Sequence, residues 1–229
     1  MRYWVVDSET TGLDDEAKTV EVAGFYCVDG EIIKHYSSLV NPGIPIPAAA
    51  SAVHHITDSD VANAPSIEEA MMPFFDEEFE FAIAHQSKFD MRFMDFGSCP
   101  WLCTWKLALR IYPDAPSYGN QVLRYYLNLP SPVVAKKEFA HRALYDSEVT
   151  THLFHDILKK AKHEDPWPGM QKVSESPGLL KTCYLSKHKN TPWKEVPRDY
   201  LNWIVNPRKP HPQPFDEDIL YTAKYYLER

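Results

Sequence analysis

Hydrophobic and polar positions in the first 40 residues follow the pattern of β-strands separated by turns. Residues 3–7 are aromatic and β-branched, which favours a strand. Two longer apolar stretches, 19–28 and 31–40, flank the dipeptide Asp29-Gly30, a strong signal for a tight hairpin turn. Together these segments predict an antiparallel unit of three strands.

The chain from there to about residue 160 alternates between short apolar runs and segments with helical spacing. The longest helical pattern covers 141–160, and Ser66 with Glu69 forms a capping box that predicts a helix over 66–77. The pattern also predicts strands at 79–84 and 101–105 and helices near 48–54, 87–96, just after 105 to about 111, and 118–128. This order predicts an α/β fold: a mixed five-stranded sheet, three antiparallel strands followed by two more, with helices on its faces.

Length and charge divide the chain into two parts. A chain of 229 residues accommodates one domain of ordinary size and an extension. The stretch DPWPGMQ is predicted to link a domain at 1–163 to a C-terminal module at 164–229, which ends in a short helix near 216–228. Up to residue 165 there are 14 basic and 25 acidic residues, and after it 10 basic and 7 acidic. A net charge of −8 argues against a passive nucleic-acid binder, but bound metal ions could mask the acidic part, and the module could supply a basic surface.

Two acidic residues, Asp7 and Glu9, come where the first predicted strand ends. Residues two apart on a strand point to the same face, so these carboxylates are expected to project together. Their repulsion is tolerable if one is protonated or if a cation lies between them, and oxygen ligands at this spacing suit Mg²⁺ or Mn²⁺. From the spacing alone, a polar strand end in a solvated turn is an equally good interpretation.

Further acids and a histidine follow later in the chain. Asp90 comes after the strand at 79–84, and by itself it is best explained as an acid favoured by a helix dipole. His141 and Asp146 are five apart, about 140° around a regular helix, and would not share a face. They can serve one site only if His141 precedes the helix or lies in a loosened first turn. Considered alone, His141 is more simply a surface residue.

The segments VVDSETTGL (5–13), VHHIT (53–57), AHQSKFD (84–90) and HRALYDSEVT (141–150) together resemble the motifs of the DEDDh 3′→5′ exonucleases. The resemblance covers about residues 1–163 and is weaker in the tail. It implies a ribonuclease H-like fold and removal of nucleotides one at a time from 3′ ends, with two Mg²⁺ or Mn²⁺ ions. It also implies that Asp7, Glu9 and Asp146 bind the catalytic metal. Asp7 and Asp90 would serve the second metal, and His141 would be the general base.

The same resemblance implies a set of substrate contacts, for each of which ordinary packing or capping is an equally good interpretation. These are Ser8, Thr10, Leu13, His54, Gln86 and Phe89. The family usually has asparagine at the position of Gln86, which puts that residue's contact in doubt. Glu21 matches an acid found in many relatives and is expected to be a buried structural carboxylate.

The tail contains LSKHKNTPWKEVPRDYLNWIV (185–205), which resembles a small module that follows the nuclease domain in some relatives. Ser186 and Asn190 stand where that module usually has glycines. The expected DNA contacts are Lys187, Lys189, Trp193 and Lys194. A solvated charged face over an apolar helix explains the same residues equally well.

The overall likeness, tail included, favours a deoxyribonuclease acting on 3′ ends of single-stranded or duplex DNA. The nearest alternative is the same chemistry on RNA, as in ribonuclease T or oligoribonuclease, because fine pocket shape decides whether a 2′ hydroxyl is accepted. A catalytically silent nucleic-acid-binding module is a further alternative. The sequence predicts no membrane segment and no signal peptide, and four cysteines without a CxxC pair favour a cytoplasmic protein with reduced thiols. Nothing in it favours a particular oligomeric state.

Overall fold

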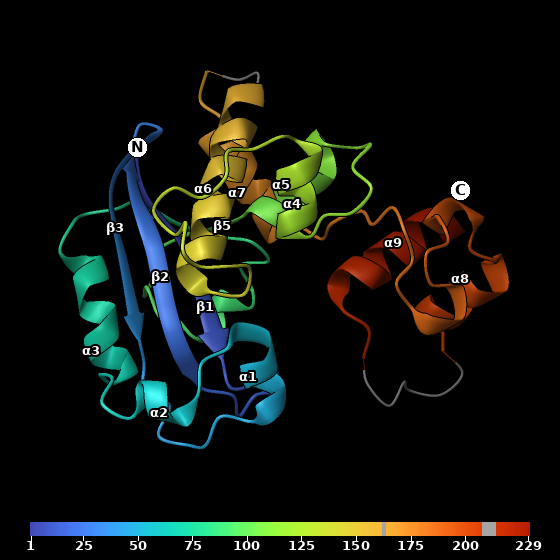
Figure 1. Ribbon diagram of the computed structural model, residues 1–229. Coiled ribbons are helices and arrows are strands. Elements are labelled where there is room, and N and C mark those ends of the chain that lie inside the picture. Colours follow the sequence, from blue (N-terminus) through green and yellow to red (C-terminus); the bar gives the residue numbers. More distant parts are fainter. Residues whose placement is uncertain (162–163, 208–213) are drawn as a thin grey trace. The chain divides into compact units, whose positions relative to one another are not determined.

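The computed structural model describes residues 1–161, 164–207 and 214–229. The chain divides into two compact units, Met1–Gln171 (unit 1) and Lys172–Arg229 (unit 2). Unit 1 contains a five-stranded sheet in the order β3-β2-β1-β4-β5 (Figure 1). Its strands are β1 (Arg2–Thr10), β2 (Thr19–Val28), β3 (Glu31–Leu39), β4 (Phe81–Ala84) and β5 (Trp101–Cys103).

The strand pairing is that of a mixed sheet, as predicted. β1 pairs antiparallel with β2, and β2 with β3, whereas β4 runs parallel to both β1 and β5. Asp29 and Gly30 join β2 to β3 with φ values of 50° and 88°, the positive values that a type I′ hairpin turn requires.

The two faces of β1 meet different partners. Trp4 and Val6 belong to a core cluster with Phe74, which lies in the 3-10 turn η1 (Met72–Phe75). Tyr3 points to the opposite face, where its ring meets Phe154 of α6 (Ala143–Lys160) at 5.3 Å between centroids. Figure 1 shows α6 crossing this second face of the sheet. Because side chains alternate along a strand, the odd-numbered residues that follow Tyr3 also face α6.

Helices connect and cover these strands. In unit 1 they are α1 (Ala48–His54), α2 (Asp58–Val61), α3 (Ile67–Met71), α4 (Thr104–Ile111), α5 (Asn120–Tyr126) and α6 (Ala143–Lys160), with the 3-10 turns η1 (Met72–Phe75) and η2 (Asp90–Arg92). The helix predicted over 66–77 is shorter in the structure: α3 ends at Met71, and the 3-10 turn η1, which contains Pro73, follows it directly. The predicted helix at 87–96 is wrong: Gln86 has a φ of 64°, and only η2 follows the turn after it.

The predicted linker after residue 163 contains a helix, α7 (Trp167–Glu175). Trp167 stacks on Phe81 with 5.1 Å between ring centroids, and it also meets Tyr3 and Phe154. These contacts place Trp167 in the core of unit 1. Residues 162–163, at the predicted domain boundary, lie outside the described residues.

Unit 2 is a small helical body. It contains η3 (Ser186–His188), η4 (Trp193–Glu195), α8 (Arg198–Val205) and α9 (Glu217–Leu227). Trp193, Leu201 and Ile204 form part of its buried interior with Ile219. Among all the described helices, none combines the length and the apolar character needed to cross a membrane.

Candidate active site

Three carboxylates converge where β1 ends and α6 begins. Asp7 and Glu9 lie on the β1 face that meets α6, as their spacing predicts, and Asp146 lies in the first turn of α6. One carboxylate oxygen from each lies within 4.8 Å of those of the other two. Within the described residues, this is the group of acids whose geometry could hold a metal ion.

A fourth acid, Asp90, enters from the turn after β4. Its side chain is buried and accepts a hydrogen bond of 2.8 Å from the Ser8 hydroxyl. Ser8 therefore positions this carboxylate through its side chain. The burial of Asp90 also argues against the simpler explanation of an exposed acid at a helix end.

His141 precedes α6, which is one of the two arrangements that its spacing from Asp146 allows, so the helix predicted from residue 141 starts two residues later. The helix begins at Ala143, Arg142 is extended, and His141 has a φ of 69°. The His141 backbone N–H donates to Asp146 Oδ2 at 2.6 Å, while the exposed imidazole remains at the rim. This hydrogen bond fixes the backbone of His141 relative to the Asp146 carboxylate.

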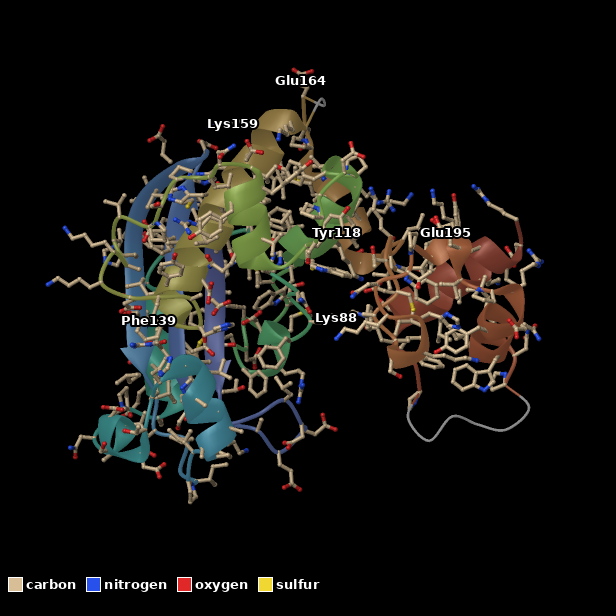
Figure 2. All side chains as sticks on the ribbon, turned by 45° about the vertical axis from the view of Figure 1, so that its right-hand side comes forward. Lys88, Tyr118, Phe139, Lys159, Glu164 and Glu195 are labelled. Atoms are coloured by element: carbon tan, nitrogen blue, oxygen red, sulfur yellow. The ribbon has the colours of Figure 1, made fainter. Side chains whose placement is uncertain are left out.

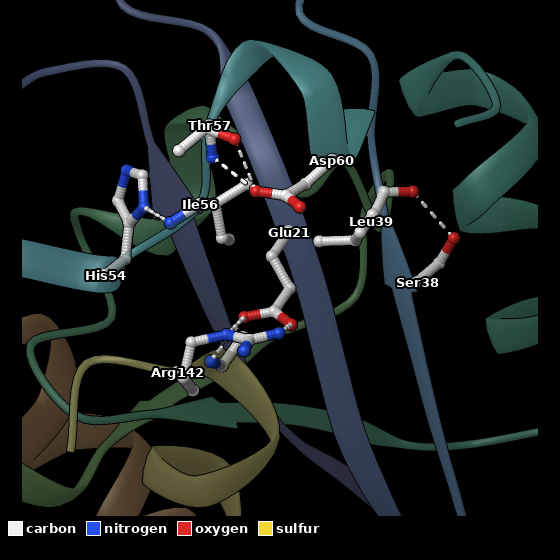
Figure 3. A network of polar contacts seen from close by, with 9 residues as sticks. Glu21, Ser38, Leu39, His54, Ile56, Thr57, Asp60 and Arg142 are labelled. Carbon is white, nitrogen blue, oxygen red and sulfur yellow. Dashed lines mark hydrogen bonds and ion pairs between the residues drawn. The ribbon is translucent and has the colours of Figure 1, made fainter. Parts of the chain in front are cut away.

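Glu21 on β2 binds the residues at which α6 begins (Figure 3). Its carboxylate is 3% exposed and accepts from Arg142 Nε at 3.0 Å, from a second guanidinium nitrogen, and from the Ala143 backbone N–H at 2.9 Å. Glu21 is therefore a structural acid, as predicted, and its partner is the residue between His141 and the helix.

Burial and mutual repulsion alter the acidity of the carboxyl cluster. Burial raises the pKa of Asp7 well above its usual range, and the neighbouring carboxylates add to this shift. Burial and then the charge of Asp146 raise the pKa of Glu9 to about 8. Burial raises the pKa of Asp90 to about 7, although hydrogen bonds from Ser8 oppose it. Burial also raises the pKa of Asp146.

These acids border a cavity of about 500 Å³. Its lining residues are Asp7, Ser8, Glu9, Leu13, His85, Gln86, Phe89, Asp90, Gly119, Asn120, Gln121, Val122, His141 and Asp146. The cavity thus combines a carboxylate floor with apolar side chains at its edge, where Leu13 is 80% exposed. A cluster of carboxyl groups beside apolar side chains suits a cation together with a flat ring.

Two predicted substrate contacts do not line this cavity. The Thr10 side chain is buried, and its hydroxyl donates to Gly12 O at 2.6 Å. His54 is 1% exposed, and its Nδ1 accepts from the Ile56 backbone N–H at 3.0 Å (Figure 3). Internal packing encloses both side chains, and the substrate contacts expected of Thr10 and His54 stay predictions. Leu13, Gln86 and Phe89 do lie at the cavity, and their contacts with substrate stay predictions.

The structure adds residues that the sequence did not single out. Gln121 of α5 donates to Asp146 Oδ1 at 3.0 Å, and Asn120 donates to the Asp146 carbonyl at 3.1 Å. His85 contacts Thr104 Oγ1 and the Tyr118 carbonyl, and burial lowers its pKa to about 4, so it is neutral at physiological pH. Asn120 and Gln121 are adjacent amides at the start of a helix, and nothing in their spacing marks them in the sequence. Their contacts with Asp146 could be found only from the fold.

The tail residues fall into two groups. Lys187, Lys189 and Lys194 are exposed, as a role in DNA contact requires. Trp193 is fully buried, so the prediction that its ring contacts DNA is wrong. Arg208 and Lys209, which contribute to the basic surplus of the tail, lie outside the described residues.

Comparison with known proteins places these features in context. A protein-family model described as Exonuclease matches residues 4–154. Exodeoxyribonuclease 10 of Escherichia coli K12 is 32% identical over 231 residues, which cover 98% of each chain. A DNA polymerase III subunit epsilon-like protein of Rhodobacter capsulatus is 32% identical over 71% of this chain and 24% of its own.

Solved structures agree in fold. Exonuclease X in complex with 5′ overhanging duplex DNA matches with a TM-score of 0.66 and 33% identity, over 75% of this chain and 99% of its own. The nuclease domain of 3′hExo, a DEDDh family member bound to rAMP, matches with a TM-score of 0.57. It covers 69% of this chain and 92% of its own, and at 13% identity it supports the fold only. The expected resemblance to an exonuclease family and the expected fold are both confirmed.

Proposed function

The chain belongs to the exonuclease family, and from this premise we propose that it is a metal-dependent 3′→5′ exodeoxyribonuclease that releases nucleoside monophosphates. The observation that carries the proposal is the convergence of Asp7, Glu9 and Asp146 within 4.8 Å, beside Asp90 and His141 on one cavity. A silent binding module would have no need for this set.

The donor set fits divalent metal ions. Buried carboxylates with raised pKa values repel one another, and a cation among them would restore their ionised form. Carboxylate oxygens are the ligands that Mg²⁺ and Mn²⁺ prefer. Asp7, Glu9 and Asp146 would hold one ion, and Asp7 with Asp90 a second. When bound, such ions supply a water of lowered pKa and neutralise the departing oxygen.

His141 is the group positioned to accept the proton of the attacking water. Histidine is the side chain best suited to this task near neutral pH. Its ring lies at the open edge of the cavity, while its backbone is held by Asp146 and its neighbour Arg142 by Glu21. The imidazole can therefore approach a reacting water without loss of the anchor.

The apolar edge suits the last nucleotide of a strand. Leu13 and Phe89 would pack against the terminal base, and such packing accepts any base. Gln86 lies on the same side and can reach the sugar or phosphate. A 3′ end with unpaired terminal bases fits this arrangement, whether the rest of the DNA is single-stranded or duplex.

The four cysteines are reduced thiols, which is consistent with activity in the reducing cytoplasm.

The test is digestion of matched DNA and RNA oligonucleotides that carry a label at the 5′ end, with Mg²⁺ and with EDTA. We expect a ladder that shortens from the 3′ end only when metal is present, and faster shortening of DNA. Glu31→Gln removes one negative charge from an exposed position at the start of β3. It serves as the control for Asp7→Asn, which removes one charge from the carboxylate cluster. Cleavage that persists in EDTA would contradict the metal requirement, and faster digestion of RNA would contradict the DNA assignment.

A further inference from the structure

Unit 2 presents a basic loop whose base is closed by backbone hydrogen bonds. Cys183 N donates to Thr191 O, and Asn190 N donates to Cys183 O, each at 2.8 Å. Asn190 has a φ of 68°, a conformation that asparagine tolerates better than most residues. The loop carries Lys187 and Lys189, both exposed. Their backbone positions are therefore held by the closed turn.

A row of rings begins beside this loop. The His188 ring lies 4.5 Å from that of Tyr200, which stacks on Trp203 with centroids 5.2 Å apart and 26° between the planes. Trp203 meets Phe215 edge-on at 5.7 Å. The Lys187 ammonium lies 5.3 Å from the centre of the Tyr200 ring. Loop and rings thus form one continuous surface.

The amphipathic character of α8 explains why the half-buried Tyr200 and the exposed Trp203 lie away from its buried side. Leu201 and Ile204 are buried in unit 2, whereas Trp203 is 46% exposed. Tyr200 and Trp203 are three residues apart and share the other side of the helix. Exposed aromatic rings beside lysines are what strand-binding surfaces use, because bases stack on the rings and phosphates pair with the ammonium groups.

We propose that this aromatic–lysine surface, formed by Lys187, Lys189, Tyr200 and Trp203, binds single-stranded DNA. Stacking on Trp203 needs unpaired bases, so the surface would prefer a single strand to a duplex. Two residues expected from the sequence are not part of it. Trp193 is buried, and Lys194 lies 3.9 Å from the Glu195 carboxylate, which offsets its charge. Glu195 is labelled on unit 2 in Figure 2.

Charge favours a nucleic-acid strand over a protein partner. Residues 172–229 contain 10 basic and 7 acidic residues, although the preceding part of the chain is acidic. Arg208 and Lys209 contribute two of these basic residues and lie outside the described residues, so the local argument rests on Lys187 and Lys189, two exposed lysines to which a polyanion is complementary. The inference rests on the proposed function only for the identity of the polymer as DNA.

The test measures binding by the full chain in EDTA, so that no strand is cleaved. The probes are a 5′-labelled oligothymidylate of about 30 nucleotides and a blunt duplex of equal length, and the readout is fluorescence anisotropy. Trp203→Ala is expected to weaken single-strand binding about tenfold, the order of one lost base stack. Trp203→Phe should retain most of the affinity.

A second variant leaves the aromatic rings intact. The double substitution Lys187→Ala with Lys189→Ala should reduce the slope of log K against log salt by about 1.4, since a single strand contributes about 0.7 for each phosphate contact. Lys224→Ala on α9 removes one positive charge elsewhere in unit 2 and should leave the slope unchanged, whereas a nonspecific charge effect would reduce it by about half as much as the double variant does.

Several outcomes would overturn the inference. One is a double-lysine variant that has the affinity and the salt slope of the wild type. Another is tighter binding of the duplex than of the oligothymidylate by the wild type. If Trp203→Ala loses its helical circular dichroism, the double-lysine variant decides. Cleavage of a very short oligonucleotide with Mg²⁺ separates the two proposals, because it needs only the cavity in unit 1. Failure of the wild type in that assay would count against the nuclease and leave the binding result intact.

Discussion

Arg142 and Glu21 form a part-buried ion pair that joins two segments 121 positions apart in sequence. The pair places the backbone before α6 against β2, and so places His141 next to the carboxylate cluster. The Glu21 carboxylate also accepts from the first helical N–H, that of Ala143. One side chain therefore satisfies a helix terminus and positions a candidate base.

Glu21→Gln is expected to lower turnover about 10- to 100-fold while metal binding persists, because His141 loses its anchor but the metal ligands remain. The lost charge-assisted hydrogen bonds should also lower the free energy of unfolding by about 1.5–3 kcal/mol. Turnover, metal titration and thermal unfolding measure the three effects. Lys34→Gln breaks the more exposed ion pair with Glu77 and should change stability by less than about 1 kcal/mol. Equal effects from both variants would argue against a positioning role for Glu21.

Asp7→Asn is expected to abolish cleavage and the stabilisation that Mg²⁺ confers. In the metal-free state the same variant should unfold at a higher temperature than the wild type, because one buried, repelling carboxylate is gone. Thermal scans with and without Mg²⁺ separate these opposite effects. Substantial residual turnover would contradict the assignment of Asp7 as a shared metal ligand.

The metal-free protein should lose stability as the pH rises. Folding raises the pKa of Glu9 from 4.5 to about 8 and that of Asp90 from 3.8 to about 7. A carboxyl with a raised pKa favours the folded state while protonated, and this contribution is lost as the pH climbs from the unfolded value through the folded one. In EDTA, we therefore expect the unfolding temperature to fall between about pH 5 and 8. Saturating Mg²⁺ should reverse the trend, and Glu9→Gln should flatten it. A metal-free unfolding temperature that rises over this range would contradict the burial of these acids.

Glu148 anchors the other end of the segment that leads to His141. Its buried carboxylate accepts from the backbone N–H groups of Val133 (2.6 Å), Val134 (3.2 Å) and Ala135 (2.9 Å). Glu148→Ala should leave these donors without their partner and loosen the segment that bears Phe139, whose ring is labelled in Figure 2.

Trypsin provides the readout for this change, because Lys136 and Lys137 lie exposed in the same segment. Cleavage there should accelerate at least tenfold in Glu148→Ala, while cleavage at Lys159 and Lys160 at the end of α6 serves as the internal reference. An unchanged ratio of the two cleavages would show that the carboxylate does not hold the segment.

The position at which the tail is removed should decide whether the shortened chain keeps its stability and its cleavage of short oligonucleotides. A chain that ends at Ser176 keeps α7 and Trp167, and we expect it to cleave short oligonucleotides at the full rate while its affinity for long strands falls. A chain that ends at Asp165 loses the Trp167 contacts with Tyr3 and Phe81, and should lose on the order of 3 kcal/mol of stability. Thermal unfolding and oligonucleotide cleavage of both chains test this; equal melting temperatures would argue against a core role for Trp167.

The sequence by itself determined the elements and the order of the acids. Period-two and helical patterns identify the strands and the main helix because each pattern reports which face is buried, and the Asp29-Gly30 turn specifies its own hairpin. The spacing of His141 and Asp146 excluded a shared face of a regular helix and left two placements for the histidine, before the helix or in a loosened first turn. These are local constraints, and they act within a few residues.

Only the tertiary structure decided which side chains meet. Gln121, Glu148 and Arg142 act on the site through partners distant in sequence, and periodicity carries no information about such partners. Trp167 and Trp193 stand in polar, proline-rich segments, yet one packs on the core of unit 1 and the other fills unit 2. The physical reason is that burial of an aromatic ring depends on the surface that other elements build around it, and that surface exists only once the chain has folded.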